Sequence, residues 1–349
     1  MIAQVRLEAF YTSIEQQDNP SLRKQPVCVV NGGPAAIVVT ASHEARMLGV
    51  QAGMSWEAAL ELCPTCIRVT PRPTRYIEIS TQIMEALREI TPEVEVSGVD
   101  EAFLDLTSCQ SYYRYQPEAV GHLIQQTVSK AASGIFCSVG ISGDKATARW
   151  VARQSGPGEL TLLPPAQAEE RLRDVPLSDL CGIGPEVTAF FAQHNVHFCG
   201  DMKKIPMSVP AQRYGNVGRR WWLMAQARDP SHVDAGRKPA ITLGQGKILS
   251  PQTGEIAVIQ GHFMRMAERL ATDLRRRGLL IPEFHIAIRC TEGWRQAWLR
   301  PPQATCDSLE IFRLSKRFLR QHWFGDNVQQ IRIQASSPVS EACQPDFFA

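Results

Sequence analysis

The sequence lacks any apolar run approaching the ~18 residues that a membrane-spanning helix needs, and its first residues lack the features of a signal peptide. It also lacks a disulfide framework, because its 10 cysteines are scattered and several lie inside apolar runs, as reduced and buried thiols do. Cys63 and Cys66 have the spacing of half a zinc site, but no second Cys or His pair follows at a suitable distance. We therefore expect a cytoplasmic protein with no membrane partner.

A strong net charge is absent as well, since the 349 residues have a formal charge of +2. The charge is unevenly distributed, because from Ala235 to the end there are 16 Lys and Arg against 10 Asp and Glu, a surplus of six. A basic C-terminal third predicts contact with nucleic acid phosphates, and the alternative is a basic surface without a partner. The length allows two to three domains, each with its own core.

Two adjacent carboxylates are the centre of what the sequence does contain. Asp100 and Glu101 lie between a small-residue turn at Gly98 and an apolar run that predicts a strand. Neighbouring side chains on a strand point to opposite faces, so the two could share one metal ion only if the bend at Gly98 redirects one of them. Mg²⁺ is typically held by one or two carboxylates together with substrate phosphates. The alternative interpretation is a solvated acidic turn.

The order of the predicted elements favours an α+β fold, with a sheet that has the site on one face and helices on the other. Strands are expected at residues 2–10 and 137–142, beside the strand at Glu101, and a hairpin at 25–30 and 36–40. The periodicity of apolar residues predicts helices at residues 12–17, 44–50, 75–90, 117–133, 145–153, 256–278 and 307–324.

Gly182 and Gly184 form an apolar-x-Gly-x-Gly pattern between two helix-like flanks. Two glycines let a backbone approach a phosphate closely, and the N-terminus of the following helix offers unpaired N–H groups and a positive dipole. The pattern therefore predicts a helix-hairpin-helix contact with DNA. Further along, basic clusters fall on predicted helices, and each is either a DNA contact or a solvated helix face: Arg275, Arg276 and Arg277, and then Arg313, Lys316, Arg317 and Arg320.

Two stretches, VRLEAFY at 5–11 and SGVDEAFLD at 97–105, resemble the motifs of the Y-family (lesion-bypass) DNA polymerases. In that family the opening strand is Val-Asp-x-Asp-x-Phe-Tyr/Phe, and the second motif is Ser-x-Asp-Glu-Ala-Tyr/Phe-Leu-Asp. The second stretch matches almost letter for letter. In the first stretch, Arg6 occupies the position of the first metal-binding aspartate.

The resemblance covers essentially the whole chain and implies a right-hand polymerase architecture. It assigns a palm at 1–18 and 76–165, fingers at 19–75, a helix-hairpin-helix thumb at 166–232, a tether at 233–240, a little finger at 241–335 and a tail at 336–349. By resemblance, two Mg²⁺ ions would be held by Asp100, Glu101 and the backbone carbonyl of Leu7. Glu8 shares a strand face with position 6 and is a candidate substitute for the third carboxylate, although relatives have an acidic residue there without using it as a ligand. The nucleotide contacts would be Phe10, Tyr11, His43 and Arg46, and the DNA contacts Gly182, Gly184, Arg275, Arg276, Arg277, Lys316 and Arg317.

Three departures from the family pattern concern the chemistry. His43 replaces the tyrosine of the family's Tyr-x-x-Arg, although Arg46 remains, and Gly156 replaces the lysine before Pro-x-Gly, with Arg153 as a nearby substitute. Tyr11, which matches the steric gate against a ribose hydroxyl, is retained. At position 6, a cation ~4 Å from Mg²⁺ would repel it by about 8 kcal/mol even at an effective dielectric of ~20. We expect Arg6 to form an ion pair with the two carboxylates of the second motif instead.

Two functions remain open. The first is a bacterial accessory protein of lesion bypass that binds primer-template DNA, works with other proteins of a mutasome or the SOS response, and has little or no nucleotidyl transfer. The alternative is an active translesion DNA polymerase that uses two Mg²⁺ ions and a rearranged third ligand. A structural adaptor without DNA affinity is disfavoured by the basic C-terminal third.

The end of the chain resembles a bacterial sliding-clamp-binding motif. Residues 335–343 have little periodic apolar content and are expected to be mobile. The motif that follows has two large apolar anchors and an orienting glutamine, at positions Gln344, Asp346, Phe347 and Phe348. The alternative is a chance Phe-Phe tail.

Overall fold

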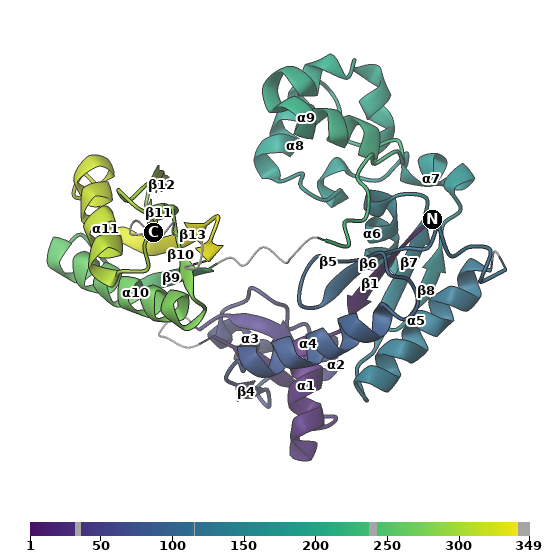
Figure 1. Ribbon diagram of the computed structural model, residues 1–349, viewed down its shortest axis with the longest axis horizontal. Helices are drawn as coiled ribbons and strands as arrows, with labels where there is room; N and C mark the ends of the chain where they lie inside the picture. Colours follow the sequence, from purple (N-terminus) through teal and green to yellow (C-terminus); the bar gives the residue numbers. More distant parts are fainter. Residues whose placement is uncertain (32–35, 115, 237–242, 341–349) are drawn as a thin grey trace, which may run out of the picture. The chain divides into compact units, whose positions relative to one another are not determined.

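The computed structural model describes residues 1–31, 36–114, 116–236 and 243–340, and the chain divides into two compact units (Figure 1). The first unit consists of Met1–Gly32 and Ala36–Pro239, and the second of Gly33–Ala35 and Ala240–Ala349. Each unit has its own hydrophobic core. Among the described residues, no helix combines the length and the apolar character that crossing a bilayer requires.

A five-stranded sheet with the order β5-β6-β1-β7-β8 forms the centre of the first unit. Its strands are β1 (Ile2–Leu7), β5 (Val94–Val96), β6 (Glu101–Asp105), β7 (Cys137–Ser142) and β8 (Leu160–Leu162). Strand β1 pairs antiparallel with β6 and β7, which places Arg6 opposite Glu101 on one side and Ser138 on the other. Directly opposed residues share a face of the sheet, so these three side chains start from the same face.

The strand predicted over residues 2–10 is shorter in the structure. It ends at Leu7, because Ala9 has a left-handed backbone (φ 45°) that turns the chain into α1 (Phe10–Asp18). An L-residue rarely adopts this conformation, so the turn is held by its surroundings. Thr12 Oγ1 donates to the carbonyl of Ala9 at 2.8 Å and fixes the first turn of the helix.

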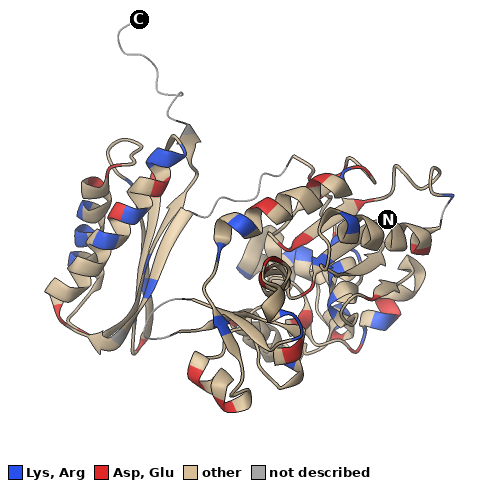
Figure 2. Ribbon diagram, turned by 90° about the horizontal axis from the view of Figure 1, so that it is seen from below, with Lys and Arg blue, Asp and Glu red and all other residues tan. Residues whose placement is uncertain are grey.

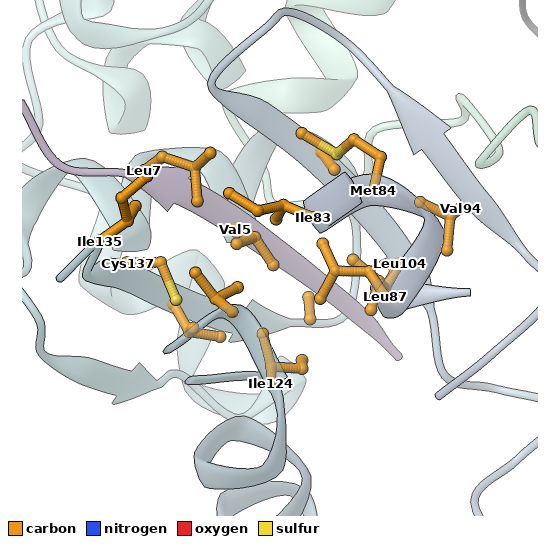
Figure 3. Packing of buried hydrophobic residues seen from close by; sticks show 14 of the residues in the cluster. Val5, Leu7, Ile83, Met84, Leu87, Val94, Leu104, Ile124, Ile135 and Cys137 are labelled. Carbon is orange, nitrogen blue, oxygen red and sulfur yellow. The ribbon is translucent and has the colours of Figure 1, made fainter. Parts of the chain in front are cut away.

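Helices α4 (Pro73–Leu87) and α5 (Pro117–Ala131) cover one face of this sheet. Apolar residues recur at every second position of the strands and about every 3.6 positions of the helices. Both kinds of element therefore present an apolar side to this core, as their sequence patterns predicted. Figure 3 shows the resulting core, to which both layers contribute the side chains of Val5, Leu7, Leu104, Cys137, Ile83, Met84, Leu87 and Ile124.

The opposite face, expected to be free of helices, is covered by α6 (Lys145–Gln154), where Ala148 packs against Phe103. The helix begins at Asp144, whose Oδ1 accepts from the Thr147 backbone N–H at 3.0 Å. It lies very close to β7 because Gly140 has no side chain: a Cβ there would stand 2.4 Å from the Ala152 nitrogen. The prediction of a helix-free site face was therefore wrong.

A smaller, three-stranded sheet has the order β3-β2-β4, with β2 (Val27–Val30), β3 (Val38–Ala41) and β4 (Ile67–Val69). Strands β2 and β3 are antiparallel, which confirms the predicted hairpin. Two short helices follow β3, namely α2 (His43–Met47) and α3 (Trp56–Leu62), and serine hydroxyls at both N-caps accept backbone N–H groups. Gly49 has φ +91°, which only glycine adopts easily, and it ends the first of these helices as predicted.

The rest of the first unit is helical, with α7 (Pro165–Leu172), α8 (Pro185–Gln193) and α9 (Ser208–Met224) around a core of their own. After α9 the chain was predicted to become a free tether. In the structure Val233 is buried against the large sheet, and the Asp234 backbone N–H donates to Glu95 Oε2 at 2.9 Å. The first residues of the predicted tether are therefore packed, because an apolar side chain and a buried carboxylate hold them.

The second unit contains an antiparallel sheet with the order β12-β11-β13-β9. Its strands are β9 (Leu243–Thr253), β11 (Glu283–Cys290), β12 (Gly293–Leu299) and β13 (Val328–Ser336). Helices α10 (Ile256–Arg276) and α11 (Ser308–His322) lie on one face, where they bury Phe263 and Phe318 against inward-facing strand residues. Figure 2 shows both helices on the same side of this sheet.

Part of the segment predicted to be a mobile tail is ordered. Strand β14 (Val339–Ser340) pairs antiparallel with β10 (Leu279–Leu280), directly after α10. Backbone pairing of this kind does not require a periodic apolar pattern, so the amino-acid pattern of this segment did not predict it. The predicted clamp-binding residues Gln344, Asp346, Phe347 and Phe348 lie outside the described residues.

Candidate functional site

Asp100 and Glu101 lie at the start of β6, next to the end of β1, and both are half-buried. The preceding bend is closed by two hydrogen bonds, from the backbone N–H groups of Ser97 and Gly98 to the Glu101 carbonyl at 3.0 and 3.1 Å. The Leu7 backbone N–H donates to the Asp100 carbonyl at 2.8 Å, which ties the bend to β1. The bend predicted at Gly98 is therefore present and places the two carboxylates beside the first motif.

Arg6 does not pair with those two carboxylates, so the predicted ion pair was wrong. Its Nε and Nη2 donate to Glu8 Oε1 at 3.1 and 2.6 Å. Positions i and i+2 of a strand point to the same side, which lets a long arginine reach its own neighbour. Glu8 is nearly buried and also accepts from Ser138 Oγ at 2.6 Å, while Arg46 Nη1 lies 3.7 Å from its other oxygen. This carboxylate is thus fully engaged by protein groups.

Glu101 is paired with Arg149, a residue of α6 that the sequence analysis did not single out. The arginine Nη2 donates to Glu101 Oε2, and its Cζ lies 5.8 Å from the centre of the Phe103 ring. Its buried Nε has no hydrogen-bond partner among the described residues. The two partners are 48 residues apart in sequence, so only the docking of α6 on β7 brings them together.

The electrostatics of Asp100 reflect a crowded acidic site. Burial raises the pKa of its carboxyl, and the adjacent charge of Glu101 raises it further, while Arg6 and Arg149 lower it in part. Burial and the charge of Asp100 also raise the pKa of Tyr11, which places its ring close to the site. Tyr11 stacks on Tyr76 with centroids 4.5 Å apart.

The carboxylates in this arrangement do not fit a pair of Mg²⁺ ions. Among the described residues there is no group of three or more His, Cys, Asp or Glu side chains placed to hold a metal. Glu101 and Glu8 each accept a hydrogen bond from an arginine. Of the three carboxylates of the site, Asp100 is the one without an ion pair among the described residues. Three guanidinium groups, from Arg6, Arg46 and Arg149, thus face three carboxylates, and the site is neutral without a metal.

The other predicted nucleotide contacts are partly brought together. Phe10 is buried in the core, and Tyr11 is half-exposed beside it. Arg46 reaches the site through Glu8, whereas His43 is exposed at the start of the same helix. Ser138 Oγ, which donates to Glu8, also lies 3.0 Å from the carbonyl oxygen of Gly156, so the loop that lacks the family's lysine lies next to Glu8.

The glycine pair lies in the loop before α8, where Gly182 has φ +84° and Gly184 is the N-cap. A side chain at Gly182 would be strained and would meet Trp221 Nε1 at 3.2 Å. Gly182 also lines a cavity of about 670 Å³ that reaches the large sheet and the base of α6, where Lys145 and Arg149 line it. The predicted DNA-contacting loop thus shares this cavity with Arg149, the partner of Glu101.

The predicted basic clusters of the second unit all belong to its helical layer (Figure 2). Arg275 and Arg276 are in the last turn of α10 and Arg277 is its C-cap, all three exposed, and Lys316 and Arg317 lie on α11. The opposite face of the sheet has exposed aromatic and basic residues that the sequence analysis missed. These residues occupy alternate positions of β11, β12 and β13, and this spacing was the sequence signal that could have found them.

The fold and the site together define the class of protein: a right-hand polymerase architecture with palm, fingers, helix-hairpin-helix thumb and little finger. A solved structure, the "Y-family DNA polymerase chimera Dbh-Dpo4(243-245)-Dbh", matches 97% of this chain and 99% of its own, with a TM-score of 0.83 and 20% sequence identity.

The sequence comparisons identify the family. Residues 5–153 match the impB/mucB/samB family, and residues 242–346 match the impB/mucB/samB family C-terminal domain. The chain is 31% identical to "DNA polymerase IV" of Moorella thermoacetica, over 90% of this chain and 80% of the relative. It is 30% identical to "DNA polymerase IV" of Pelotomaculum thermopropionicum, over 91% and 79%. The chain therefore belongs to the impB/mucB/samB family, that is, to the Y-family of DNA polymerases.

Proposed function

We propose that this protein binds primer-template DNA in bacterial lesion bypass as an accessory Y-family member, with little or no nucleotidyl transfer. The proposal rests on one observation: the carboxylates expected to bind metal are held by arginines, Glu101 by Arg149 and Glu8 by Arg6. A two-metal reaction would need those oxygens free to hold the metal ions.

Energetics support the same conclusion. A metal at Glu101 would have to displace a part-buried, charge-assisted pair with Arg149, which is stronger than a neutral hydrogen bond. It would also stand close to Arg6, and a unit charge ~4 Å away repels a dication by about 8 kcal/mol at an effective dielectric of ~20. The missing lysine at Gly156 and the missing tyrosine at His43 would leave a triphosphate weakly held as well.

An active translesion DNA polymerase is the second candidate, and it is favoured by the relatives, which are named DNA polymerase IV. Asp100, Glu101, Tyr11 and Arg46 are all present, and Mg²⁺ is the cofactor that the family generally uses. For this function Arg149 would have to release Glu101 on DNA or nucleotide binding, and Glu8 or the Leu7 carbonyl would have to complete the ligand set.

Primer extension distinguishes the two candidates. We expect the full chain to bind a fluorescent primer-template in anisotropy measurements but to add no nucleotide in Mg²⁺. Any slow extension in Mn²⁺ should disappear in the double variant Asp100→Ala, Glu101→Ala, which serves as a control for contaminating polymerase. Robust extension by the unaltered protein in Mg²⁺ would establish the polymerase function, and failure to bind primer-template would contradict both candidates.

The subdomain bounds given by the resemblance, with the palm at 1–18 and 76–165 and the little finger at 241–335, are part of the proposal. So is a sliding clamp as partner, through Phe347 and Phe348. Replacing both with alanine should weaken clamp binding by at least ~2 kcal/mol, the scale of an interface hot spot, in a surface-plasmon measurement. Undiminished clamp binding by a chain cut after Ala342 would refute this partner.

A further inference from the structure

Three cysteines lie together in the core of the small three-stranded sheet, and the proposed function uses none of them. Cys28 is in β2, Cys63 is the C-cap of α3, and Cys66 comes just before β4. Their side chains are buried, with 0%, 1% and 8% of the residue surface exposed. The parallel pairing of β2 with β4 brings Cys28 and Cys66 side by side, although they are 38 positions apart in sequence.

Two of these thiols are close enough to form a disulfide. The Sγ atoms of Cys28 and Cys66 are 3.2 Å apart. A disulfide bond is ~2.05 Å long, so the sulfurs have to approach each other by about 1.2 Å. Cys28 is held in the central strand of the sheet, whereas Cys66 follows a turn in which Pro64 and Thr65 are exposed. A movement of this turn therefore suffices, and the pairing of the strands stays in place.

The hydrogen bond between the two thiols distinguishes them from other buried cysteines. Cys66 Sγ donates to Cys28 Sγ and lowers the pKa of Cys28, because the donor stabilises the thiolate more than burial and the nearby Cys63 destabilise it. At Cys137 and Cys199, by contrast, burial raises the pKa to about 12. The thiolate is the form that reacts with oxidants, so the pair should react before these thiols. Once one proton has left, the two sulfurs share the other, which makes the charge available at the more exposed Cys66.

From this geometry we propose that Cys28 and Cys66 are a redox-sensitive pair, which hydrogen peroxide converts reversibly into a disulfide between β2 and the segment before β4. In the first step a thiolate attacks one peroxide oxygen, the O–O bond breaks, and the other oxygen takes up a proton and leaves as water. The second thiol then attacks the resulting sulfenic acid, so that the S–S bond forms, the S–O bond breaks and another water leaves. Two thiols are oxidised and one peroxide is reduced to two water molecules. The inference is independent of the proposed function.

The disulfide would connect the small sheet to the candidate site through one strand pair. Cys28 is paired with Ala41 of β3, whose carbonyl accepts from Arg46 Nε at 2.9 Å. The Nη1 atom of the same arginine lies 3.7 Å from Glu8 Oε2. Oxidation therefore fixes the strand beside the one that positions Arg46. We expect β2 and β4 to exchange their amide hydrogens more slowly in the oxidised chain than in the reduced chain.

Peptide mapping of the unaltered full chain tests the pair. The reduced chain is treated with hydrogen peroxide, its remaining thiols are alkylated, and trypsin is applied without reductant. Tryptic cleavage leaves Cys28 in the peptide 25–46 and Cys66 in the peptide 47–68. We expect these two peptides to be linked, about two of the 10 thiols to be lost before Cys290 reacts, and dithiothreitol to restore them.

Variants identify the partners. Cys63 is in the same peptide as Cys66, so Cys63→Ala should retain the link between the two peptides, whereas Cys28→Ala should abolish it. Cys290→Ala, at a buried thiol of the second unit, is the matched control and should leave the link unchanged.

Three results would each overturn the inference: a disulfide within the peptide 47–68, overoxidation of the pair without a link, or equal amide exchange of β2 and β4 in the reduced and oxidised chains. None of them bears on the proposed function, because DNA binding and primer extension are measured on the reduced chain.

Discussion

At the scale of single residues, the arginine at position 6 changes the ion pairing of a second residue, Glu8. Arg6 stands where the family motif has an aspartate, and its guanidinium pairs with Glu8, a second acidic residue two positions along the chain. The arginine at position 6 therefore removes one carboxylate from the site and neutralises a second one, that of Glu8. Arg149 has the equivalent effect on Glu101 from the opposite side.

Returning a carboxylate to position 6 should restore metal binding. In Arg6→Asp, Glu8 loses its arginine and a third acidic group joins Asp100 and Glu101. We expect Mn²⁺ affinity, followed by the loss of the free-ion EPR signal, to rise at least tenfold, or ~1.4 kcal/mol. Arg88→Asp makes the same change of two charge units at an exposed position away from the site and should leave Mn²⁺ binding unchanged. Equal effects of both variants would indicate nonspecific attraction.

The raised pKa of Asp100 predicts that its charge destabilises the fold. A carboxyl whose pKa is higher in the folded than in the unfolded state contributes stability below its unfolded pKa, ~3.9, and this stability is lost as the pH rises through the folded pKa. Asp100→Asn removes the charge with little change in shape. It should increase the free energy of unfolding at pH 7.5, and the gain should shrink as the pH is lowered through the folded pKa toward the unfolded pKa of ~3.9.

Urea unfolding at several pH values measures this effect. Asp174→Asn, at a side chain that is 84% exposed, is the matched control and should give a difference near zero at every pH. A destabilising effect of Asp100→Asn at pH 7.5 would mean that the arginines Arg6 and Arg149 outweigh burial and repulsion at this carboxylate.

At the scale of elements, the distance between α6 and β7 determines whether Glu101 is paired, because α6 presents Arg149 to it. Gly140 sets this distance, since a Cβ there would meet backbone atoms of Ala148 and Ala152 at 2.5 and 2.4 Å. The neighbouring pair of Lys145 and Glu95, with Nζ and Oε2 2.5 Å apart, holds the start of the same helix.

Gly140→Ala should therefore push α6 away from the sheet. We expect a loss of roughly 1–3 kcal/mol in stability from overpacking, together with faster amide hydrogen exchange in residues 145–154. Gly261→Ala, inside α10 and 3.8 Å from the nearest side-chain atom, is the matched control and should be neutral or stabilising. Unchanged exchange in α6 of the Gly140 variant would show that the helix is not held in this way.

At the scale of the whole molecule, the surplus of positive charge in the C-terminal third is divided between two faces of the second unit. The helical layer has the clusters at Arg275 and Lys316. The face of the sheet opposite these helices, here called the open face, has Arg289 and Arg332 beside Trp294 and Trp298. These surfaces lie on opposite sides of one sheet, so they cannot all contact the same stretch of DNA. Measurements of DNA affinity against salt concentration separate their contributions.

Affinity for primer-template DNA should fall with salt at a slope of about −0.9 per phosphate neutralised. If the helical layer contacts phosphates, neutralising Arg275, Arg276 and Arg277 together should make this slope less steep, by up to the contribution of three phosphate contacts. Arg289→Ala with Arg332→Ala is the comparison from the open face. An unchanged slope in the triple variant would identify the cluster as a solvated helix face.

The sequence by itself determined most of the elements and singled out the two adjacent carboxylates of the candidate site. Strong periodicity predicted α4, α5, α6, α10 and α11 to within a few residues, and the hairpin and the bend at Gly98 followed from turn chemistry. These features are local, because backbone dihedrals, caps and apolar stripes are set by residues close in the chain. Motif matching alone identified Asp100, Glu101 and the departure at Arg6.

Only the tertiary structure decided which charges meet. Arg6 had two sets of carboxylates within reach and pairs with Glu8, which follows directly after the end of β1, and Ser138 from the next strand helps to hold Glu8 in place. Arg149 reaches Glu101 because a glycine lets α6 approach the sheet. The open face with its two tryptophans exists because both helices of the second unit pack on the other side. Long-range contacts of this kind depend on how layers pack, and no spacing along the chain encodes them.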